Sequence, residues 1–334
     1  MQYYWSENEL LNSYIWNQYI IYPEKHLKRI LFSIIAIFTV SLHAQNTYEF
    51  LRVDISPRAA ALAGSFTAGS GDVNVINYNP AAIGQLEGSP FSANFVKHLL
   101  DINFFGVAYS RNFEGIGRFA AAVRYANYGT FSEYDEFGNK GGTYGVNELA
   151  LTVGYSNVLA DNFYYGANVK LIHSSIASYS SSGAAFDIGL QYLIPSQLMT
   201  IGFAMSNAGG QLSSYNGVTE KLPFDVSVGV SKKMEHLPVK LFLDFHRLNE
   251  DQGDFVKRFE YFSFGTEFYL SKVLTLRLGY DNKKRKELKV GDFAGLAGFN
   301  AGLGVKIDRY FFDYAFSSYG EIGALHRIGI STEL

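Results

Sequence analysis

The chain has 334 residues, no cysteine, 48% hydrophobic residues and a formal net charge of -3 at pH 7. This composition fits a globular protein or a β-barrel, and it excludes a disordered chain and a helical membrane protein. Without cysteine there is no disulfide framework, no thiol chemistry and no cysteine-based metal site. The small net charge says little about partners, and we expect no nucleic acid among them.

The first 44 residues are typical of a leader that contains a secretory signal peptide. A basic stretch over 25–29 precedes an apolar run over 30–40, and the small residue Ala44 follows as a cleavage position. The run is too short to cross a bilayer as a helix. Residues 1–24 are long for a charged region, which indicates either a long leader or a misassigned start. No later segment is long and apolar enough for a membrane helix, so any membrane insertion must use strands.

Residues 45–90 contain little alternation of apolar and polar side chains. Ser56 before Pro57 is a typical helix start, and Gly64 is a typical stop for the short Ala-rich turn between them. Asn79-Pro80 predicts a turn. We therefore predict a compact irregular segment that rests against something larger.

From residue 91 to residue 334, apolar and polar residues alternate nearly continuously, most clearly over 222–246. A period of two predicts β-strands with one apolar and one polar face. We count 14 candidate strands, over 91–97, 102–111, 117–128, 145–156, 162–174, 183–194, 198–207, 222–232, 238–248, 259–270, 272–281, 295–307, 309–317 and 325–334.

Charge is confined to one face of these strands. The apolar face includes Phe119, Val123, Leu151, Val169, Phe186, Leu303, Phe312 and Ile328. The other face carries Arg118, Arg124, Glu148, Lys170, Asp187, Gln191, Asp225, Asp244, Glu267, Arg277, Asn300, Lys306, Asp313 and Arg327. A continuous apolar face opposite a face of mixed charge is what the lipid-facing and lumen-facing sides of a membrane barrel require.

The predicted connections alternate in length. They are short at 112–116, 157–161, 195–197, 233–237, 271 and 308, and long at 129–144, 208–221, 249–258 and 282–294. Outer-membrane barrels have short periplasmic turns and longer outer loops. The pattern predicts an all-β, 14-stranded antiparallel transmembrane β-barrel over 91–334 in the outer membrane of a Gram-negative bacterium. Both termini are then periplasmic, the long loops are extracellular, and residues 45–90 form a hatch that plugs the lumen.

Part of this hatch resembles a known family. The motif residues are Pro57, Arg58, Ala59, Leu62 and Gly64, followed by Asp72-Val73-Asn74 and by Asn79, Pro80 and Ala81. They resemble the N-terminal hatch of the FadL-like outer-membrane barrels, and within them the PorV/PorQ branch. Ala63 stands where that branch has glycine, and Arg58 lies one place nearer the proline.

The resemblance implies a non-catalytic component of the type IX secretion attachment complex, without a cofactor. Its implied partners are a PorU-like sortase, a PorV-like shuttle barrel and a PorZ-like surface protein, which process cargo proteins and attach them to lipopolysaccharide. The alternative is a FadL-like transporter of hydrophobic small molecules, which a continuous apolar pocket between hatch and wall favours. A third reading is an integral outer-membrane acyl hydrolase. Fold-level analogy alone does not decide among them.

Two sets of cations have candidate roles. Arg58 is expected to tie the hatch to lumen carboxylates such as Asp187, Asp244 or Asp313, because an arginine fork holds a carboxylate at two points. The alternative for Arg58 is an exposed cation at a helix end. A second set, Lys283, Lys284, Arg285 and Lys286, is expected either to contact lipopolysaccharide phosphates or an acidic partner, or to be a solvated loop.

Other motifs carry little weight. His173-Ser174 and the pair Asp244 and His246 lack the third group that a nucleophile site needs, so we expect no enzyme activity. The seven histidines show no metal-ligand spacing. Gly298, Gly302 and Gly304 alternate within a strand and precede no helix, unlike a nucleotide-binding loop.

Overall fold

The computed structural model describes residues 46–250, 256–289 and 295–333. The predicted leader over 1–44, with its cleavage near Ala44, lies outside these residues. None of the helices in the described part of the chain is long and apolar enough to cross a membrane.

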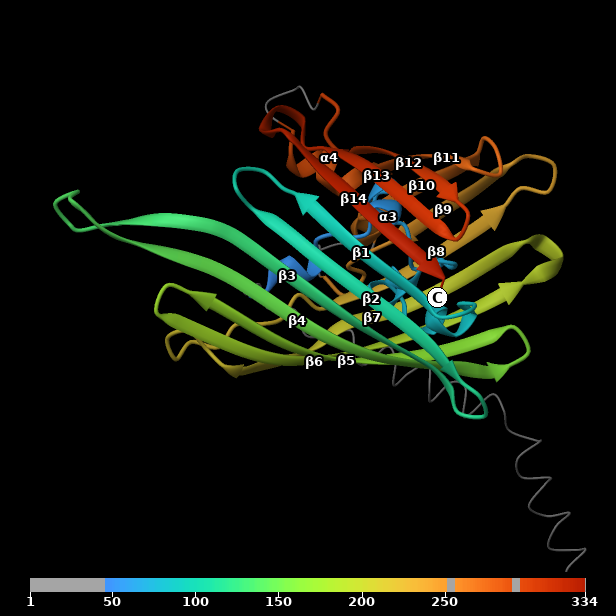
Figure 1. Cartoon of the computed structure of the whole chain (residues 1–334), viewed down its shortest axis with the longest axis horizontal. Helices are drawn as coiled ribbons and strands as arrows, with labels where there is room; N and C mark the ends of the chain where they lie inside the picture. The colour runs from blue at the N-terminus through green and yellow to red at the C-terminus, as the bar shows by residue number, and fades with distance from the viewer. Residues whose placement is uncertain (1–45, 251–255, 290–294, 334) are drawn as a thin grey trace, which may run out of the picture. The chain divides into compact units, whose positions relative to one another are not determined.

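Fourteen antiparallel strands close into a barrel, as predicted (Figure 1). Each strand pairs with the next one along the chain, and β1 pairs with β14 to close the sheet. The strands are β1 Pro90–Lys97, β2 Asn103–Phe113, β3 Gly117–Tyr134, β4 Lys140–Ala160, β5 Phe163–Ile176, β6 Tyr179–Ile194, β7 Met199–Ser213, β8 Asp225–Lys233, β9 Val239–Phe245, β10 Phe262–Tyr269, β11 Leu274–Asp281, β12 Phe299–Ile307, β13 Tyr310–Ser318 and β14 Ala324–Glu333.

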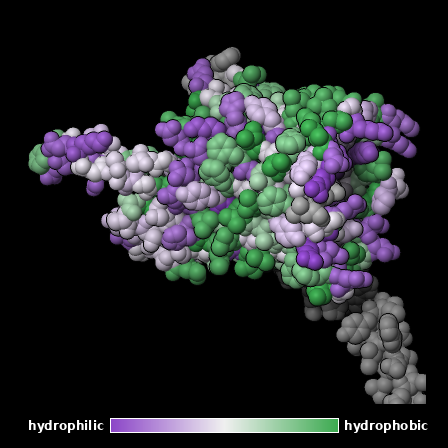
Figure 2. Space-filling view, in the orientation of Figure 1, coloured by the Kyte–Doolittle hydropathy of each residue, from purple (hydrophilic) through white to green (hydrophobic). Residues whose placement is uncertain are grey.

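The two faces of the wall differ in polarity in the way the alternation predicts. On β5, Val169 and Leu171 are 62% and 56% exposed, whereas Asn168 and Lys170 are 1% and 6% exposed. Figure 2 shows apolar residues gathered over the outer surface of the strands. A water-soluble protein buries its apolar side chains and exposes its charges. The reverse arrangement here fits a wall that faces lipid outside and a polar lumen inside.

The connections define two ends of the barrel. At the turn end, which includes the link between β2 and β3, the connections are 114–116, 161–162, 195–198, 234–238, 270–273 and 308–309, and the 195–198 link contains η4 (Pro195–Gln197). The opposite end, which we call the loop end, carries η5 (Val256–Glu260), α4 (Asn282–Glu287) and η6 (Gly320–Ile322).

The prediction of a long loop over 129–144 is wrong. β3 continues to Tyr134 and β4 begins at Lys140, so the two strands form a hairpin that projects past the other strands at the loop end (Figure 1). The rings of Phe131 and Tyr144 stack across it with centroids 5.5 Å apart, and such cross-strand aromatic pairs stabilise a sheet. The strict alternation in connection length is also wrong, because only residues 177–178 separate β5 from β6 at this end.

Residues 46–89, which we call the N-terminal segment, lie inside the barrel (Figure 1). The segment contains η1 (Glu49–Arg52), α3 (Pro57–Ala61), η2 (Val73–Asn77) and η3 (Pro80–Gln85). The Ser56 side chain accepts a hydrogen bond from the Ala59 backbone N–H and so caps α3, as the Ser-Pro start predicts. Many backbone groups of the segment bond one another in short turns, and side chains of the wall bind several of the others, such as the carbonyl oxygens of Thr67 and Ala68.

Glycines on the inner face of the wall allow it to approach the N-terminal segment closely. A Cβ at Gly166 would lie 2.4 Å from the Pro80 backbone, and one at Gly202 would lie 2.3 Å from the Thr67 carbonyl oxygen. Three pairs of these glycines face each other in register: Gly166 with Gly189, Gly202 with Gly229, and Gly265 with Gly279. Glycine in a strand often marks a close approach of another backbone. The inner wall is therefore shaped to the segment.

We predict that Gly166→Ala destabilises the barrel by about 1–3 kcal/mol, because the added methyl group overpacks the contact with Pro80. Gly210→Ala on β7 is the matched control, since a Cβ there meets nothing within 4 Å. Urea midpoints of the folded barrel in lipid vesicles measure the difference. Equal midpoints for the two variants would contradict the close fit between wall and segment.

Candidate functional site

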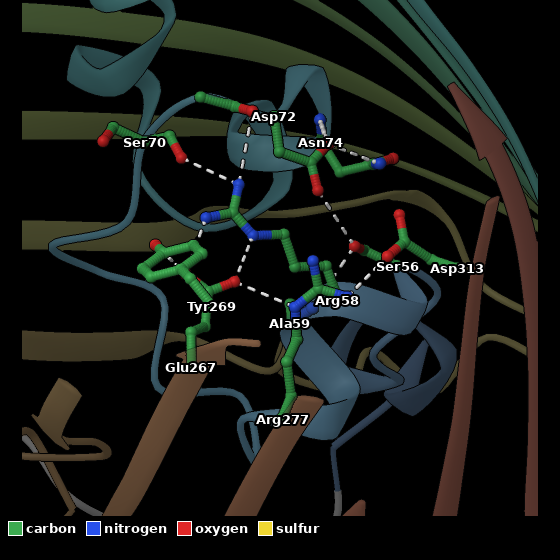
Figure 3. Close-up of polar contacts among 11 residues, drawn as sticks. Ser56, Arg58, Ala59, Ser70, Asp72, Asn74, Glu267, Tyr269, Arg277 and Asp313 are labelled. Atoms are coloured by element: carbon green, nitrogen blue, oxygen red, sulfur yellow. Dashed lines mark hydrogen bonds and ion pairs between the residues drawn. The ribbon is translucent and has the colours of Figure 1, made fainter. Parts of the chain in front are cut away.

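A chain of ion pairs joins the N-terminal segment to the wall (Figure 3). Arg58 donates from Nε and Nη2 to the two Glu267 carboxylate oxygens, at 2.7 and 3.0 Å. Arg277 Nε donates to Glu267 Oε1 at 2.8 Å, and its Nη1 pairs with Asp313. Glu267 is fully buried, so two guanidinium groups and the Tyr269 hydroxyl surround a single buried carboxylate. Charge-assisted, two-point contacts of this kind fix geometry.

Arg58 forms an ion pair with a lumen carboxylate, as expected, but the prediction of which carboxylate is wrong. Its partner is Glu267 on β10. Of the three expected acids, Asp187 pairs with Lys170 at 2.8 Å, Asp244 accepts from the Thr67 backbone N–H at 2.7 Å, and Asp313 binds Arg277. The sequence places all four acids in the lumen, and only the position of α3 next to β11, β12 and β13 decides which of them Arg58 reaches.

Asn79 is the second anchor of the segment. Its side-chain oxygen accepts from the Ala81 N–H at 3.0 Å and so caps η3, while its amide nitrogen donates to the carbonyl oxygens of Thr67, Leu190 and Phe203. Asn79 is completely buried, and one side chain therefore joins two parts of the segment to β6 and β7. The predicted turn at Asn79-Pro80 is thus held to the wall.

The other motif residues pack or turn without making ionic contacts. Pro57, Ala59, Leu62, Pro80 and Ala81 are buried. Gly64 has a φ of +77°, which favours glycine, and it follows the end of α3. The Ser156 hydroxyl donates to the Ala81 carbonyl oxygen at 2.9 Å. The structure therefore brings the two halves of the motif to opposite parts of the same inner wall, α3 beside β11–β13 and η3 beside β4–β6.

Two further arginines bind the backbone of the segment near the loop end. Arg124 donates to the carbonyl oxygens of Phe50 and Leu51, and Arg327 Nε donates to the Asp54 carbonyl oxygen at 2.6 Å. The Phe50 carbonyl oxygen also accepts from the Val53 N–H at the end of η1, so the two arginines bind carbonyl groups in and just after this short helix. Apolar side chains of the segment, among them Tyr48, Phe50 and Ile55, pack against the wall at this level.

Sequence reasoning missed Glu267 as the partner of Arg58, and it missed the inner glycines. A signal for the glycines was present, because Gly166, Gly189, Gly229 and Gly279 share the strand parity of the lumen charges. What the glycines contact could not be read from parity, since the contact is made with a distant part of the chain.

The basic residues over 283–286 lie in and around α4 at the loop end. Lys283 pairs with Glu287 at 3.2 Å, Lys284 with Asp281 at 3.3 Å, and Lys286 with Glu260 at 2.7 Å; Arg285 donates to the Gly295 carbonyl oxygen. Burial lowers the pKa of Lys284, but Tyr319, Asp281 and Asp54 outweigh it, so its pKa lies above the usual value. A contact with lipopolysaccharide or an acidic partner stays a prediction.

Two cavities lie between the N-terminal segment and the wall. One of about 800 Å³ lies toward the turn end, between the segment and the strands from β9 to β14, and its lining mixes charged residues with apolar ones such as Val73, Leu86 and Phe311. The other, of about 170 Å³, lies toward the loop end and is lined largely by polar residues, among them Asp54, Arg124 and Lys284. Between them, apolar residues including Leu62, Phe66 and Ile76 are buried in one cluster.

The residues considered for catalysis and metal binding do not assemble a site. His173 and Ser174 are neighbours on β5, and their side chains lie on opposite faces of the wall, one exposed and one buried. Asp244 is bonded to Thr67, and His246 Nε2 lies 3.0 Å from the Ser263 hydroxyl. In the described ranges, no three His, Asp or Glu residues gather as metal ligands.

Comparison with solved structures shows which known proteins have a similar fold. The barrel is similar to the toluene transporter TbuX of Ralstonia pickettii, with 14% identity, coverage of 84% of this chain and 98% of that chain, and a TM-score of 0.57. It is also similar to the toluene transporter TodX of Pseudomonas putida (15% identity, 82% and 96% coverage, TM-score 0.55). For the monoaromatic hydrocarbon channel CymD, the values are 10% identity, 84% and 98% coverage, and a TM-score of 0.53.

No protein-family model matches the sequence, and no curated protein matches it. The structural likeness shows the fold, a closed 14-stranded antiparallel barrel that is shared with these transporters. The three similar structures are named as transporters or channels rather than as enzymes. They give no indication of type IX secretion.

We predict that Glu267→Gln lowers the free energy of unfolding by about 3–5 kcal/mol, because it leaves the buried Arg58 guanidinium without its carboxylate and Arg277 with Asp313 alone. Glu136→Gln, in the exposed connection at the tip of the β3–β4 hairpin, is the control and should change little. Urea unfolding in vesicles measures both variants. A Glu267→Gln barrel as stable as the control would show that the buried pairs do not hold the segment in place.

Proposed function

We propose that this chain is an outer-membrane channel for small hydrophobic molecules. The observation that carries the proposal is the cavity of about 800 Å³ between the N-terminal segment and the wall, inside a barrel whose fold is shared with toluene transporters. A cavity of this size matches the range in which proteins bind small molecules. Its apolar residues offer contact area, and its charged residues set orientation.

In this proposal, passage requires movement of the N-terminal segment. On the loop-end side of the cavity, the segment is packed against the wall. Arg58, Asn79 and the inner glycines hold it there. Packed interiors leave no gap for a solute. The segment therefore acts as a hatch that must shift relative to the wall before a molecule can cross.

A disulfide staple tests this directly. Ser65 on the segment and Ser263 on β10 are buried, with hydroxyl oxygens 2.8 Å apart, and the chain has no cysteine of its own. Cysteines at both positions bring two sulfur atoms close to the disulfide bond length of about 2.0 Å. We expect Gram-negative host cells carrying the double variant to take up radiolabelled toluene faster than vector controls when reduced, and at the control rate when oxidised.

The single variant Ser65→Cys is the control for oxidation, and its uptake should not respond to oxidant. Unchanged uptake by the oxidised double variant would contradict movement of the hatch. Uptake equal to that of vector cells by the unmodified chain would contradict the channel itself.

A second candidate, from the sequence motif, is the anchor of a type IX attachment complex, as in a PorQ-like barrel. The observation that favours it is the projecting β3–β4 hairpin, where Phe137 and Tyr134 are 81% and 62% exposed. With the loop end outside the cell and the termini periplasmic, the hairpin offers an aromatic surface to the PorU-like, PorV-like and PorZ-like partners. Exposed aromatic side chains are frequent anchors of protein interfaces.

We predict for this candidate that the tagged chain, purified from its native cells in mild detergent, brings a sortase-like protease and a surface protein with it in mass spectrometry. Phe137→Ser together with Tyr134→Ser should reduce their recovery by about 10-fold or more, as expected when interface anchors are removed. Neutralising residues 283–286 tests the basic cluster in the same way, at low and high salt. Recovery of the barrel alone would exclude the anchor.

A further inference from the structure

The wall reverses its polarity at the loop end of β3 to β6. Glu148, Ser174 and Ser181 are in register on the lumen side of β4, β5 and β6, and all three are buried. Side chains two and four residues further along a strand return to the same face, and residues directly opposite each other share a face. Beyond Glu148 the lumen-side face therefore carries apolar residues, which are Phe131, Tyr144, Val146, Ile176 and Tyr179. We call these five residues the mouth patch.

The outer face of the same stretch is polar. Asn147, Ser175 and Ser180 are in register on it, and Ser132 pairs with Thr143 on the hairpin. Nearer the turn end, the outer face of these strands is apolar. Polar side chains without partners are costly in hydrocarbon, so the polar stretch projects beyond the lipid. Lipid therefore does not cover the mouth patch.

The mouth patch is exposed and broad. Phe131, Ile176 and Tyr179 are 42%, 38% and 54% exposed. The patch crosses β3, β4, β5 and β6, which is about 14 Å at a strand spacing of about 4.8 Å. A molecule the size of toluene covers only part of such a face, whereas another polypeptide can cover all of it. Contiguous exposed apolar surface of this kind marks protein interaction sites.

The edge of β4 beside the patch has no partner strand in the part of the chain that the structure describes. β5 ends at Ile176, and residues 140–144 of β4 continue past it with β3 on one side only (Figure 1). The Gly145 carbonyl oxygen still accepts from the Ala177 N–H on the β5 side, at 3.2 Å. The backbone groups of every second residue point to the same edge of a strand. Those of Thr143 therefore point to this open edge.

The projecting part of the hairpin is a ribbon of only two strands. Such a ribbon is marginally stable in water, and a third strand with an apolar face stabilises it. A strand beside residues 140–144 would lie over the turn that links β5 to β6. Its lumen-side residues would then extend the apolar surface between Tyr144 and Tyr179.

The charge of the hairpin tip limits the sequence of such a strand. Glu133, Asp135 and Glu136 outnumber Lys140 there, so the tip is acidic. The Asp135 carboxylate accepts from backbone N–H groups within the tip, which leaves the two glutamates to face a partner. Opposite charges across an interface favour the correct partner.

We propose that the open edge of β4 and the mouth patch together bind an extended segment of another polypeptide. The segment adds a strand beside residues 140–144, places alternate apolar side chains on the patch, and carries basic residues at its ends. In this mode the backbone hydrogen bonds provide affinity and the alternate side chains provide specificity. The inference rests on the anchor function proposed above, and it specifies the form of the anchor's partner.

The test uses the full chain in phosphatidylcholine nanodiscs and the fluorescein-labelled peptide Lys-Val-Thr-Phe-Thr-Val-Lys, with fluorescence anisotropy as the readout. We expect this peptide to bind at least about 10-fold more tightly than the same peptide with N-methyl groups on its five central residues, which cannot donate backbone hydrogen bonds. Phe131→Ser together with Tyr144→Ser should raise Kd by about 10-fold, as should Thr143→Pro, which removes an N–H from the open edge. Ser132→Ala, on the outer face of the hairpin, should leave Kd unchanged.

Two outcomes would overturn the proposal. One is equal affinity for the two peptides, or an unchanged Kd in the patch and edge variants, with heat-modifiable migration on gels confirming that each variant is a folded barrel. The other is displacement of the peptide by saturating toluene, which would show that the patch takes small apolar solutes. Recovery of the barrel alone from native cells, with peptide binding intact, would instead contradict the anchor and leave the strand site standing.

Discussion

A sheet in lipid cannot leave a backbone edge unpaired, and the rest of this structure depends on that constraint. Each unsatisfied backbone group in hydrocarbon costs several kcal/mol, so the strands must close through the pairing of β1 with β14. Closure with fourteen strands leaves a lumen too wide to be filled by wall side chains alone. Water, a ligand or another part of the chain must occupy it, and here the N-terminal segment occupies much of it.

The inner face of the wall is polar partly because the segment presents backbone groups to it. A segment with only short helices leaves several carbonyl and N–H groups for other partners, and the wall side chains Arg124, Gln191, Asp244 and Arg327 bind some of them. The ion pairs around Glu267 follow the same logic, since a charge buried in the lumen requires an opposite charge. The inner glycines of the wall have no side chain, so the backbone of the segment can lie close to the wall.

These contacts also shape what the barrel can do. The packed part of the segment closes the middle of the lumen, so the free volume lies mainly toward the turn end. If the barrel is a channel, its lumen is closed until the N-terminal segment moves. If the barrel is an anchor for other proteins, the segment stays in place and keeps the barrel rigid. The two proposed functions therefore differ in the mobility of one segment, rather than in the barrel that encloses it.

The sequence by itself determined the barrel. The period of two, the parity of charge and the count of strands are local properties, because each follows from the alternation of side chains along a strand. The same pattern placed the acidic residues on the lumen face, and the Ser-Pro pair placed the Ser56 cap in the correct position.

Only the tertiary structure decided which partners meet. Glu267 rather than Asp187, Asp244 or Asp313 binds Arg58, because the position of α3 depends on every contact of the segment with the wall. The cavity toward the turn end likewise depends on strands that are distant in the sequence, since its lining comes from the N-terminal segment and from strands between β9 and β14. Local alternation specifies which side of the wall a residue faces, and it contains no information about which residue on another strand or segment lies opposite.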